Sequence, residues 1–108
     1  MAELVVQIQP QRVAAFRESA IEQLCATPAF AALIRDASVT RGQDQGHYIN
    51  VHFTTDTPND FWPALRQQLV RLGLQAGSIV TCTGKDGWND YLLLHHYDPA
   101  QAREPSAL

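Results

Sequence analysis

The chain has 108 residues, enough for one hydrophobic core and too few for two, so we expect a single domain. Apolar residues make up 45% of it and charged residues 18%, a globular balance that excludes the disordered, collagen-like and disulfide-framework classes. Eight Lys and Arg against eleven Asp and Glu give a formal net charge of −3, and the basic residues are scattered, which disfavours nucleic-acid binding.

The compartment is inferred from the N-terminus and the cysteines. Residues 1–6 lack the basic start and long apolar stretch of a secretory signal, and no apolar run approaches about 18 residues. We therefore expect a cytoplasmic protein with no membrane partner. Cys25 and Cys82 lack C-x-x-C spacing, which favours buried reduced thiols over a disulfide or a nucleophile.

The chain opens with a strand pattern followed by a helix pattern. Apolar residues alternate with polar ones over residues 3–9, as in a strand with one buried face. Pro10 suits a helix start, and apolar residues at helical spacing then predict a helix to about Ala26. The apolar positions of this helix are Val13, Phe16, Ala20 and Leu24. Thr27 and Pro28 resemble a second helix start, which predicts a break and a short helix that carries Phe30 toward the core.

The middle of the chain predicts a hairpin and a second long helix. Residues 38–41 and 47–55 are strand-like and flank a polar loop with a glycine at each end. The capping residues 57–60 precede apolar residues at helical spacing, and Gly73 is a suitable helix end. Pro63 requires the helix to begin close by, because a deeper proline would remove a backbone hydrogen bond.

The last part of the chain predicts another hairpin. Residues 78–83 and 91–97 are strand-like, and the Gly- and Asp-rich residues 84–90 form the turn. Two prolines and no apolar periodicity predict a flexible tail over residues 99–108, after a domain that spans residues 1–98.

The order of strand, helix, hairpin, helix and hairpin predicts an α+β fold. It is the ferredoxin-like β-α-β-β-α-β order with an appended C-terminal strand, and right-handed crossovers place both helices on one face of the antiparallel sheet. We expect the spatial strand order 2-3-1-4-5. Such folds host unrelated functions, so the fold alone predicts no chemistry.

One face of this sheet is expected to be open, polar and aromatic. Strand alternation places Tyr48, Asn50 and His52 on it, and in the last strand we assign Tyr91, Leu93, His95 and Tyr97 outward. The continuous run 92–94 indicates that both faces of this strand are covered, which helices on one side alone do not achieve.

Two explanations remain open for what covers the sheet face that the helices leave free. One is a homodimer in which sheets pack together, with Trp88, Tyr91 and Leu93 as candidate interface residues. The other is a ligand pocket, compatible with the dimer. Its candidate lining residues are Tyr48, Asn50, His52, Tyr91, His95 and Tyr97.

Catalytic, metal and cofactor signatures are weak. His95 and His96 point to opposite faces of a strand, and only His52 and His95 could meet, so we predict no metal site and no cofactor. Residues 84–87 lack the further residues of a phosphate loop. No Ser-His-Asp, Cys-His or paired-carboxylate arrangement is indicated, and the first strand lacks the stacking aromatics of an RNA-binding sheet.

These patterns favour a small intracellular, non-catalytic binding or interaction module that acts as a homodimer. A regulatory, ligand-sensing or toxin-neutralising role would suit it, with a small molecule or a protein as partner. The alternative is a cofactor-free enzyme. The opening strand with Pro10 and Phe16 is similar to dimeric α+β-barrel monooxygenases and isomerases, and this resemblance implies His52 or His95 as the acid/base, with a tyrosine or Asn50 as orienting donor.

Overall fold

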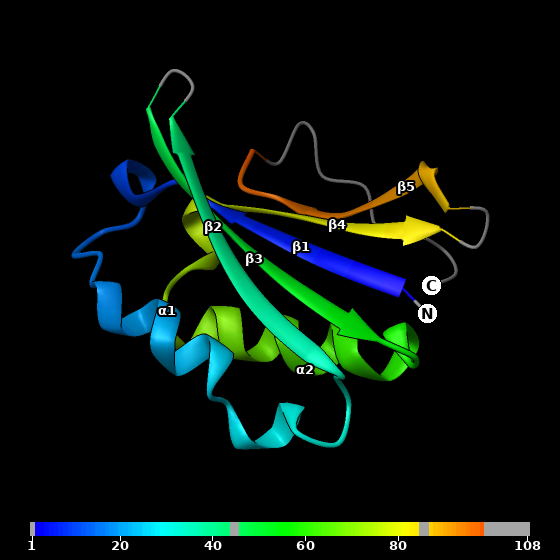
Figure 1. Ribbon diagram of the computed structural model, residues 1–108. Coiled ribbons are helices and arrows are strands. Elements are labelled where there is room, and N and C mark those ends of the chain that lie inside the picture. Colours follow the sequence, from blue (N-terminus) through cyan, green and yellow to red (C-terminus); the bar gives the residue numbers. More distant parts are fainter. Residues whose placement is uncertain (1, 44–45, 85–86, 99–108) are drawn as a thin grey trace.

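Strand β1 (Ala2–Ile8) lies at the centre of a five-stranded antiparallel sheet in the computed structural model (Figure 1). The structure describes residues 2–43, 46–84 and 87–98, with the backbone alone for residues 84 and 87–91. The other strands are β2 (Asp36–Gln43), β3 (His47–Thr55), β4 (Ser78–Gly84) and β5 (Gly87–His96). The spatial order is β2-β3-β1-β4-β5, which confirms the predicted order.

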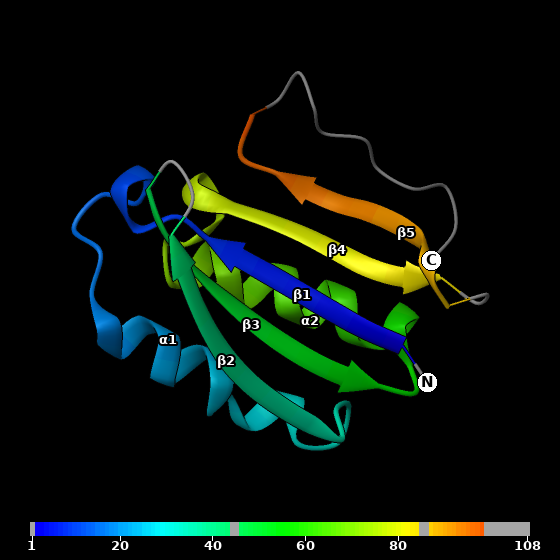
Figure 2. The same ribbon diagram turned by 45° about the horizontal axis from the view of Figure 1, so that its top comes forward.

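Helices α1 (Glu18–Cys25) and α2 (Pro58–Arg71) both lie against the same face of the sheet (Figures 1 and 2). Each helix buries one stripe of apolar residues, as expected for amphipathic helices packed on a sheet. The buried residues are Ile21 and Leu24 in α1 and Phe61, Leu65 and Leu69 in α2. The described residues therefore form an α+β fold with two layers. No described helix has the length and apolar character needed to cross a membrane.

The core follows from the two-residue period of the strands. Leu4, Val6 and Ile8 are fully buried on the helix side of β1, and β3 contributes Ile49, Val51 and Phe53 in the same way. Phe30, Phe53 and Phe61 meet edge to face, with ring centroids 4.9 to 5.7 Å apart. This cluster holds α2 and the segment after α1 against the sheet.

The helix predicted from Pro10 to Ala26 is wrong in its first half. Residues Pro10–Arg12 form a 3₁₀ turn, Val13 is extended, and α1 begins only at Glu18. Between them Ala15 has a φ of 53°, in the left-handed region that L-residues rarely adopt. The cause is tertiary, because the buried Val13 packs beside Gly77, and the Gln9 N–H donates to the Gly77 carbonyl at 2.8 Å.

Other predicted boundaries also shift. The short helix after Pro28 is a 3₁₀ turn, Pro28–Phe30, and the Thr27 hydroxyl donates backward to the Gln23 and Leu24 carbonyls rather than capping it. β2 is longer than predicted. The last turn is shorter than the predicted 84–90, because β5 begins at Gly87, and the predicted tail 99–108 lies outside the described residues.

The second helix starts and ends near its predicted limits. Pro58 occupies its first position, which leaves Pro63 in the second turn, where the side chain is exposed. Gly73 follows the helix with a φ of 70°, and the Leu74 N–H donates to the Leu69 carbonyl as in a Schellman ending.

The cysteines are free thiols, Cys82 buried and Cys25 half-buried, and burial raises the pKa of both.

Substitution of Gly77 tests the contact that breaks the first helix. A Cβ at this position would lie 2.6 Å from Val13 Cγ2 and 2.9 Å from the Gln9 carbonyl oxygen. We expect Gly77→Ala to lower the free energy of unfolding by about 1–3 kcal/mol in urea denaturation. Ala76→Ser, on the exposed part of the same turn, is the control and should change it by less than about 0.5 kcal/mol. Equal stability of both variants would contradict the packing described.

The ion pair of Glu18 and Arg41 ties α1 to β2 through two hydrogen bonds of 2.8 Å. These bonds, with the charges of Arg41 and His47, lower the pKa of Glu18 against an opposing effect of partial desolvation. Because the folded-state pKa lies below the unfolded one, the pair stabilises the fold above the unfolded-state pKa. That stabilisation disappears as the pH falls through the lowered folded-state value. Both side chains are exposed, so the effect is small.

Carboxyl titration by NMR checks this pair. We expect the Glu18 midpoint to rise in Arg41→Gln relative to the native chain, because the substitution removes the hydrogen bonds that favour the carboxylate. Arg35→Gln is the matched control, since Arg35 pairs with Asp56 instead, and it should leave the Glu18 midpoint in place. An unchanged midpoint in Arg41→Gln would show that the pair does not form in solution.

Candidate functional site

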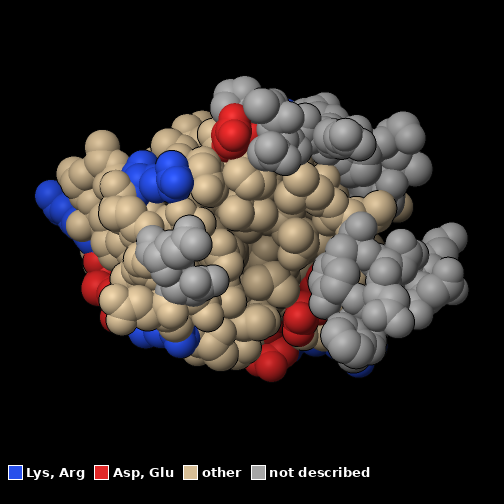
Figure 3. All heavy atoms as spheres, turned by 90° about the horizontal axis from the view of Figure 1, so that it is seen from above, with Lys and Arg blue, Asp and Glu red and all other residues tan. Residues whose placement is uncertain are grey.

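The sheet face turned away from α1 and α2 is the open face. Figure 3 looks onto it and shows mostly uncharged side chains, with charged ones toward the margin. The strand registers place residues of all five strands on this face. Those with described side chains or glycine are Asp36, Ser38, Thr40 and Gly42 of β2; Tyr48, Asn50, His52 and Thr54 of β3; Glu3, Val5 and Gln7 of β1; Ile79, Thr81 and Thr83 of β4; and Leu93 and His96 of β5.

A band of aliphatic side chains crosses the open face. Val5 lies opposite both His52 and Thr81, and Thr81 lies opposite Leu93. Two residues further along β1, Gln7 lies opposite Ile79. Val5 and Leu93 therefore flank Thr81, and Ile79 is diagonal to both, so these three half-buried aliphatic side chains form a patch around Thr81 on β1, β4 and β5.

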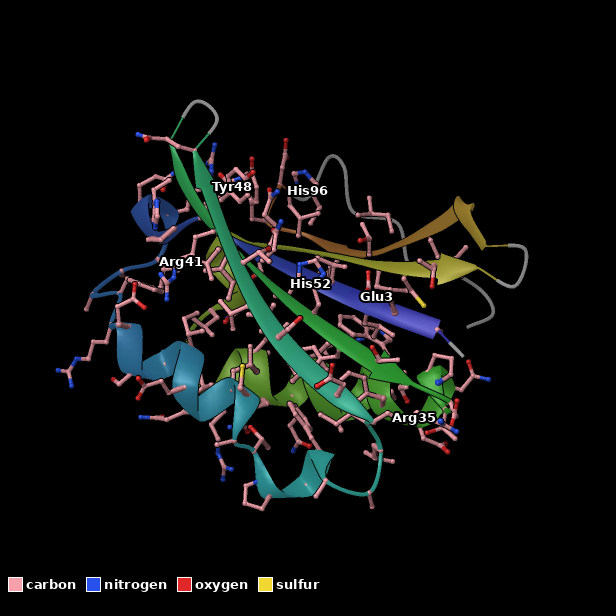
Figure 4. All side chains as sticks on the ribbon, in the orientation of Figure 1. Glu3, Arg35, Arg41, Tyr48, His52 and His96 are labelled. Atoms are coloured by element: carbon pink, nitrogen blue, oxygen red, sulfur yellow. The ribbon has the colours of Figure 1, made fainter. Side chains whose placement is uncertain are left out.

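His52 is the central titratable residue of this face. Its Nε2 lies 3.0 Å from the Thr40 hydroxyl, and its Nδ1 lies 3.7 Å from Glu3 Oε1 (Figure 4). The second distance is too long for a hydrogen bond, so Thr40 is the residue that bonds to the ring. The arrangement holds the imidazole in place between β1 and β2.

Tyr48 covers the end of the open face near the β2–β3 loop. A Cβ on Gly42 would lie 2.1 Å from Tyr48 Oη, so the phenol ring lies directly over the backbone of the neighbouring strand. Glycine at this position allows the close approach. Asn50, next along β3, has its Oδ1 buried and without a hydrogen-bond partner among the described atoms.

The outward assignment of His95 is wrong. The register of β5 against β4 shifts between Val80 and Thr81, so that Thr81 lies opposite Leu93 and Val80 opposite His95. A bulge of this kind reverses the alternation beyond it. The His95 Nε2–H therefore donates to the Gln75 carbonyl at 2.8 Å on the helix side. His96, opposite Ile79, takes the position on the open face.

A polar pocket of about 350 Å³ lies at the end of the open face. Its walls come from β1, the Pro10–Arg12 turn, the start of β3 and the residue after β5. The lining residues are Gln7, Gln9, Gln11, Arg12, Gly46, His47, Tyr48 and Tyr97.

Arg12 is held in this pocket by two neighbours, Gln9 and Tyr97. Its Nε–H donates to Gln9 Oε1 at 2.7 Å, and the Gln9 amide in turn donates to Gln7 Oε1 at 3.3 Å. The guanidinium carbon lies 4.1 Å from the centre of the Tyr97 ring, a cation–π contact. Tyr97 also packs against His96, with ring centroids 4.4 Å apart.

The predicted site residues therefore divide into three groups. Tyr48, Asn50, His52 and Leu93 share the open face, and Tyr97 joins Tyr48 in the pocket. His95 lies on the opposite side of the sheet. The side chains of Trp88 and Tyr91 lie outside the described residues.

Sequence reasoning missed Arg12, Gln7 and Gln9 as pocket residues. Their position depends on the short 3₁₀ turn Pro10–Arg12. The apolar spacing predicts a continuous helix in its place. The available signal was the alternation of residues 3–9, in which Gln7 and Gln9 have the opposite parity to the apolar positions. Within the described residues, no three His, Cys, Asp or Glu side chains are grouped to hold a metal ion.

No protein-family model, curated protein or solved structure matches this chain. The geometry of the open face and its pocket therefore carries the functional argument.

Substitution of the two histidines tests the register shift. His95→Ala removes the partner of the Gln75 carbonyl, so we expect a loss of about 1 kcal/mol in the free energy of unfolding. His52→Ala removes an exposed hydrogen bond to Thr40 and should change stability by less than about 0.5 kcal/mol. Urea denaturation measures both. A larger loss for His52→Ala would contradict the helix-side position of His95.

Proposed function

We propose that this chain is a non-catalytic binding or interaction module that acts as a homodimer through its open face. The observation that carries the proposal is a broad sheet face, free of the two helices, on which most described side chains are uncharged. We further assign the fold to the ferredoxin-like plan with β5 appended. The order β2-β3-β1-β4 with both helices on one face supports that assignment.

Charge and burial favour a protein partner on this face. The centres of protein interfaces are depleted in charged residues, and a polar rim surrounds them. Among the described open-face residues of β3, β1 and β4, Glu3 is the one carboxylate and none is Lys or Arg. Val5, Ile79 and Leu93 form an aliphatic patch around Thr81. A second copy would supply the same patch, so two-fold packing of sheet on sheet would bury apolar groups against each other.

The cofactor-free enzyme remains a second candidate on one observation. His52 lies beside Glu3 and Thr40 on an accessible sheet face, which is an arrangement that could move a proton. His95 no longer supports this function, because it lies on the helix side. The polar pocket is lined by other residues than His52, so binding explains the arrangement better than catalysis does. An enzyme would lose its turnover in His52→Ala while keeping its native mass.

The native mass of the purified chain tests the homodimer. We expect twice the chain mass of 12.0 kDa by light scattering coupled to size-exclusion chromatography. Val5→Glu places a carboxylate at the centre of the open face and should dissociate the dimer, because an unpaired charge is costly in an apolar interface.

A matched variant separates interface loss from general damage. Val70→Glu makes the same change on α2, where Val70 is 56% exposed on the helix side, and should leave the dimer intact. Leu93→Glu, near the sheet edge, is a second interface variant in case Val5→Glu unfolds the chain, which thermal melting would reveal. A native chain of monomer mass, or a dimer lost only in Val70→Glu, would overturn the proposed interface.

A further inference from the structure

The polar pocket contains a positive charge without a described negative partner. Arg35 pairs with Asp56 and Arg41 pairs with Glu18, so these two arginines are neutralised within the fold. Arg12 instead bonds to an amide and stacks on an aromatic ring, and its Nη groups have no hydrogen-bond partner among the described residues. Among the described residues that line the pocket, none is an Asp or a Glu.

The contacts of Arg12 also fix its orientation. Gln9 accepts the Nε–H, and the glutamine is itself held by Gln7, so a short chain of hydrogen bonds leads from β1 to the guanidinium. The Tyr97 ring covers one face of the guanidinium plane. With Nε engaged and one face covered, the paired Nη–H groups form the edge that remains for a ligand. An ordered, unneutralised guanidinium loses little entropy when it binds an anion.

We propose that this pocket binds a small polar organic acid through a single carboxylate. The carboxylate oxygens accept hydrogen bonds from the Arg12 Nη groups in a bidentate pair. Gln7, Gln11 and Tyr48 also line the pocket, and side chains of this kind can bond to hydroxyl or amide groups on the body of the ligand. The volume of about 350 Å³ lies at the small end of known ligand sites, which suits a small ligand.

A carboxylate fits this pocket better than a phosphate. One arginine provides one full charge and a planar fork, which matches a planar monoanion. A phosphate dianion is usually held by several cations or backbone N–H groups. Among the described residues of the pocket, His47 is the one other side chain that can become cationic. This inference goes beyond the proposed homodimer, since all the residues it uses belong to one chain and lie at the end of the open face.

Titration of the isotope-labelled full chain, followed by amide NMR, tests the site. The probes are L-lactate and D-quinate, their uncharged counterparts L-lactamide and methyl D-quinate, and inorganic phosphate. We expect at least one carboxylate to shift the Gln7, Gln9 and Tyr97 amides saturably below about 10 mM, and its uncharged counterpart to leave them unmoved. No shift by either carboxylate, equal shifts by the uncharged probes, or tighter binding of phosphate would overturn the proposal.

Variants of Arg12 link the binding to the named contacts. Arg12→Gln should weaken carboxylate binding by about tenfold or more, because a charge-assisted bidentate bond is lost. Arg12→Lys keeps the charge but lacks the fork and should also bind more weakly than the native chain. Arg71→Gln removes the same charge from α2 and is the matched control, which should bind normally. Equal weakening in Arg71→Gln, or native binding in Arg12→Gln, would show that the pocket is not the site.

Retention of the native mass in Arg12→Gln separates this inference from the proposed homodimer. A dimer that binds no carboxylate would overturn the pocket alone, and a monomer that binds it would overturn the dimer alone.

Discussion

The pairing of β1 with β3 on one side and β4 on the other is the constraint on which the rest of the structure depends. Both pairs run antiparallel and keep a continuous register, so the alternation of β1 is imposed across the sheet. Leu4, Val6 and Ile8 face the helices, and Glu3, Val5 and Gln7 face away from them. A slip by one residue would exchange these two sets and place charge in the core. The same register therefore builds the core and the open face.

A second contact connects this sheet to the pocket. The buried Val13 beside Gly77, with the hydrogen bond from Gln9 to the Gly77 carbonyl, ends the Pro10 turn early and holds it at the end of β1. A continuous helix from Pro10 would carry Arg12 along the helix layer. Because the turn ends at Val13 instead, Arg12 lies next to Gln9 and the Tyr97 ring. The left-handed backbone at Ala15 shows that tertiary packing outweighs local preference here.

Much of the fold could be predicted because strong alternation and helical spacing coincide with burial. β1, β3 and α2 match their patterns, and Gly73 ends α2 as expected. The site was predicted only in part. Tyr48, Asn50 and His52 lie on the expected face, whereas the bulge in β5 exchanges His95 for His96. The three consecutive leucines gave no signal of this shift, because apolar residues on either face satisfy the same pattern. Here Leu94 is buried in the core and Leu93 faces outward.

By itself the sequence determined the α+β class, the antiparallel strand order and the two faces of β1 and β3, because residue periodicity and turn chemistry are local properties that a chain carries before it folds. Only the tertiary structure decided where Arg12 lies, which histidine reaches the open face and which residues line the pocket. Those features depend on contacts between segments far apart in the chain, Gln9 with Gly77 and Arg12 with Tyr97, and such contacts have no local pattern to mark them.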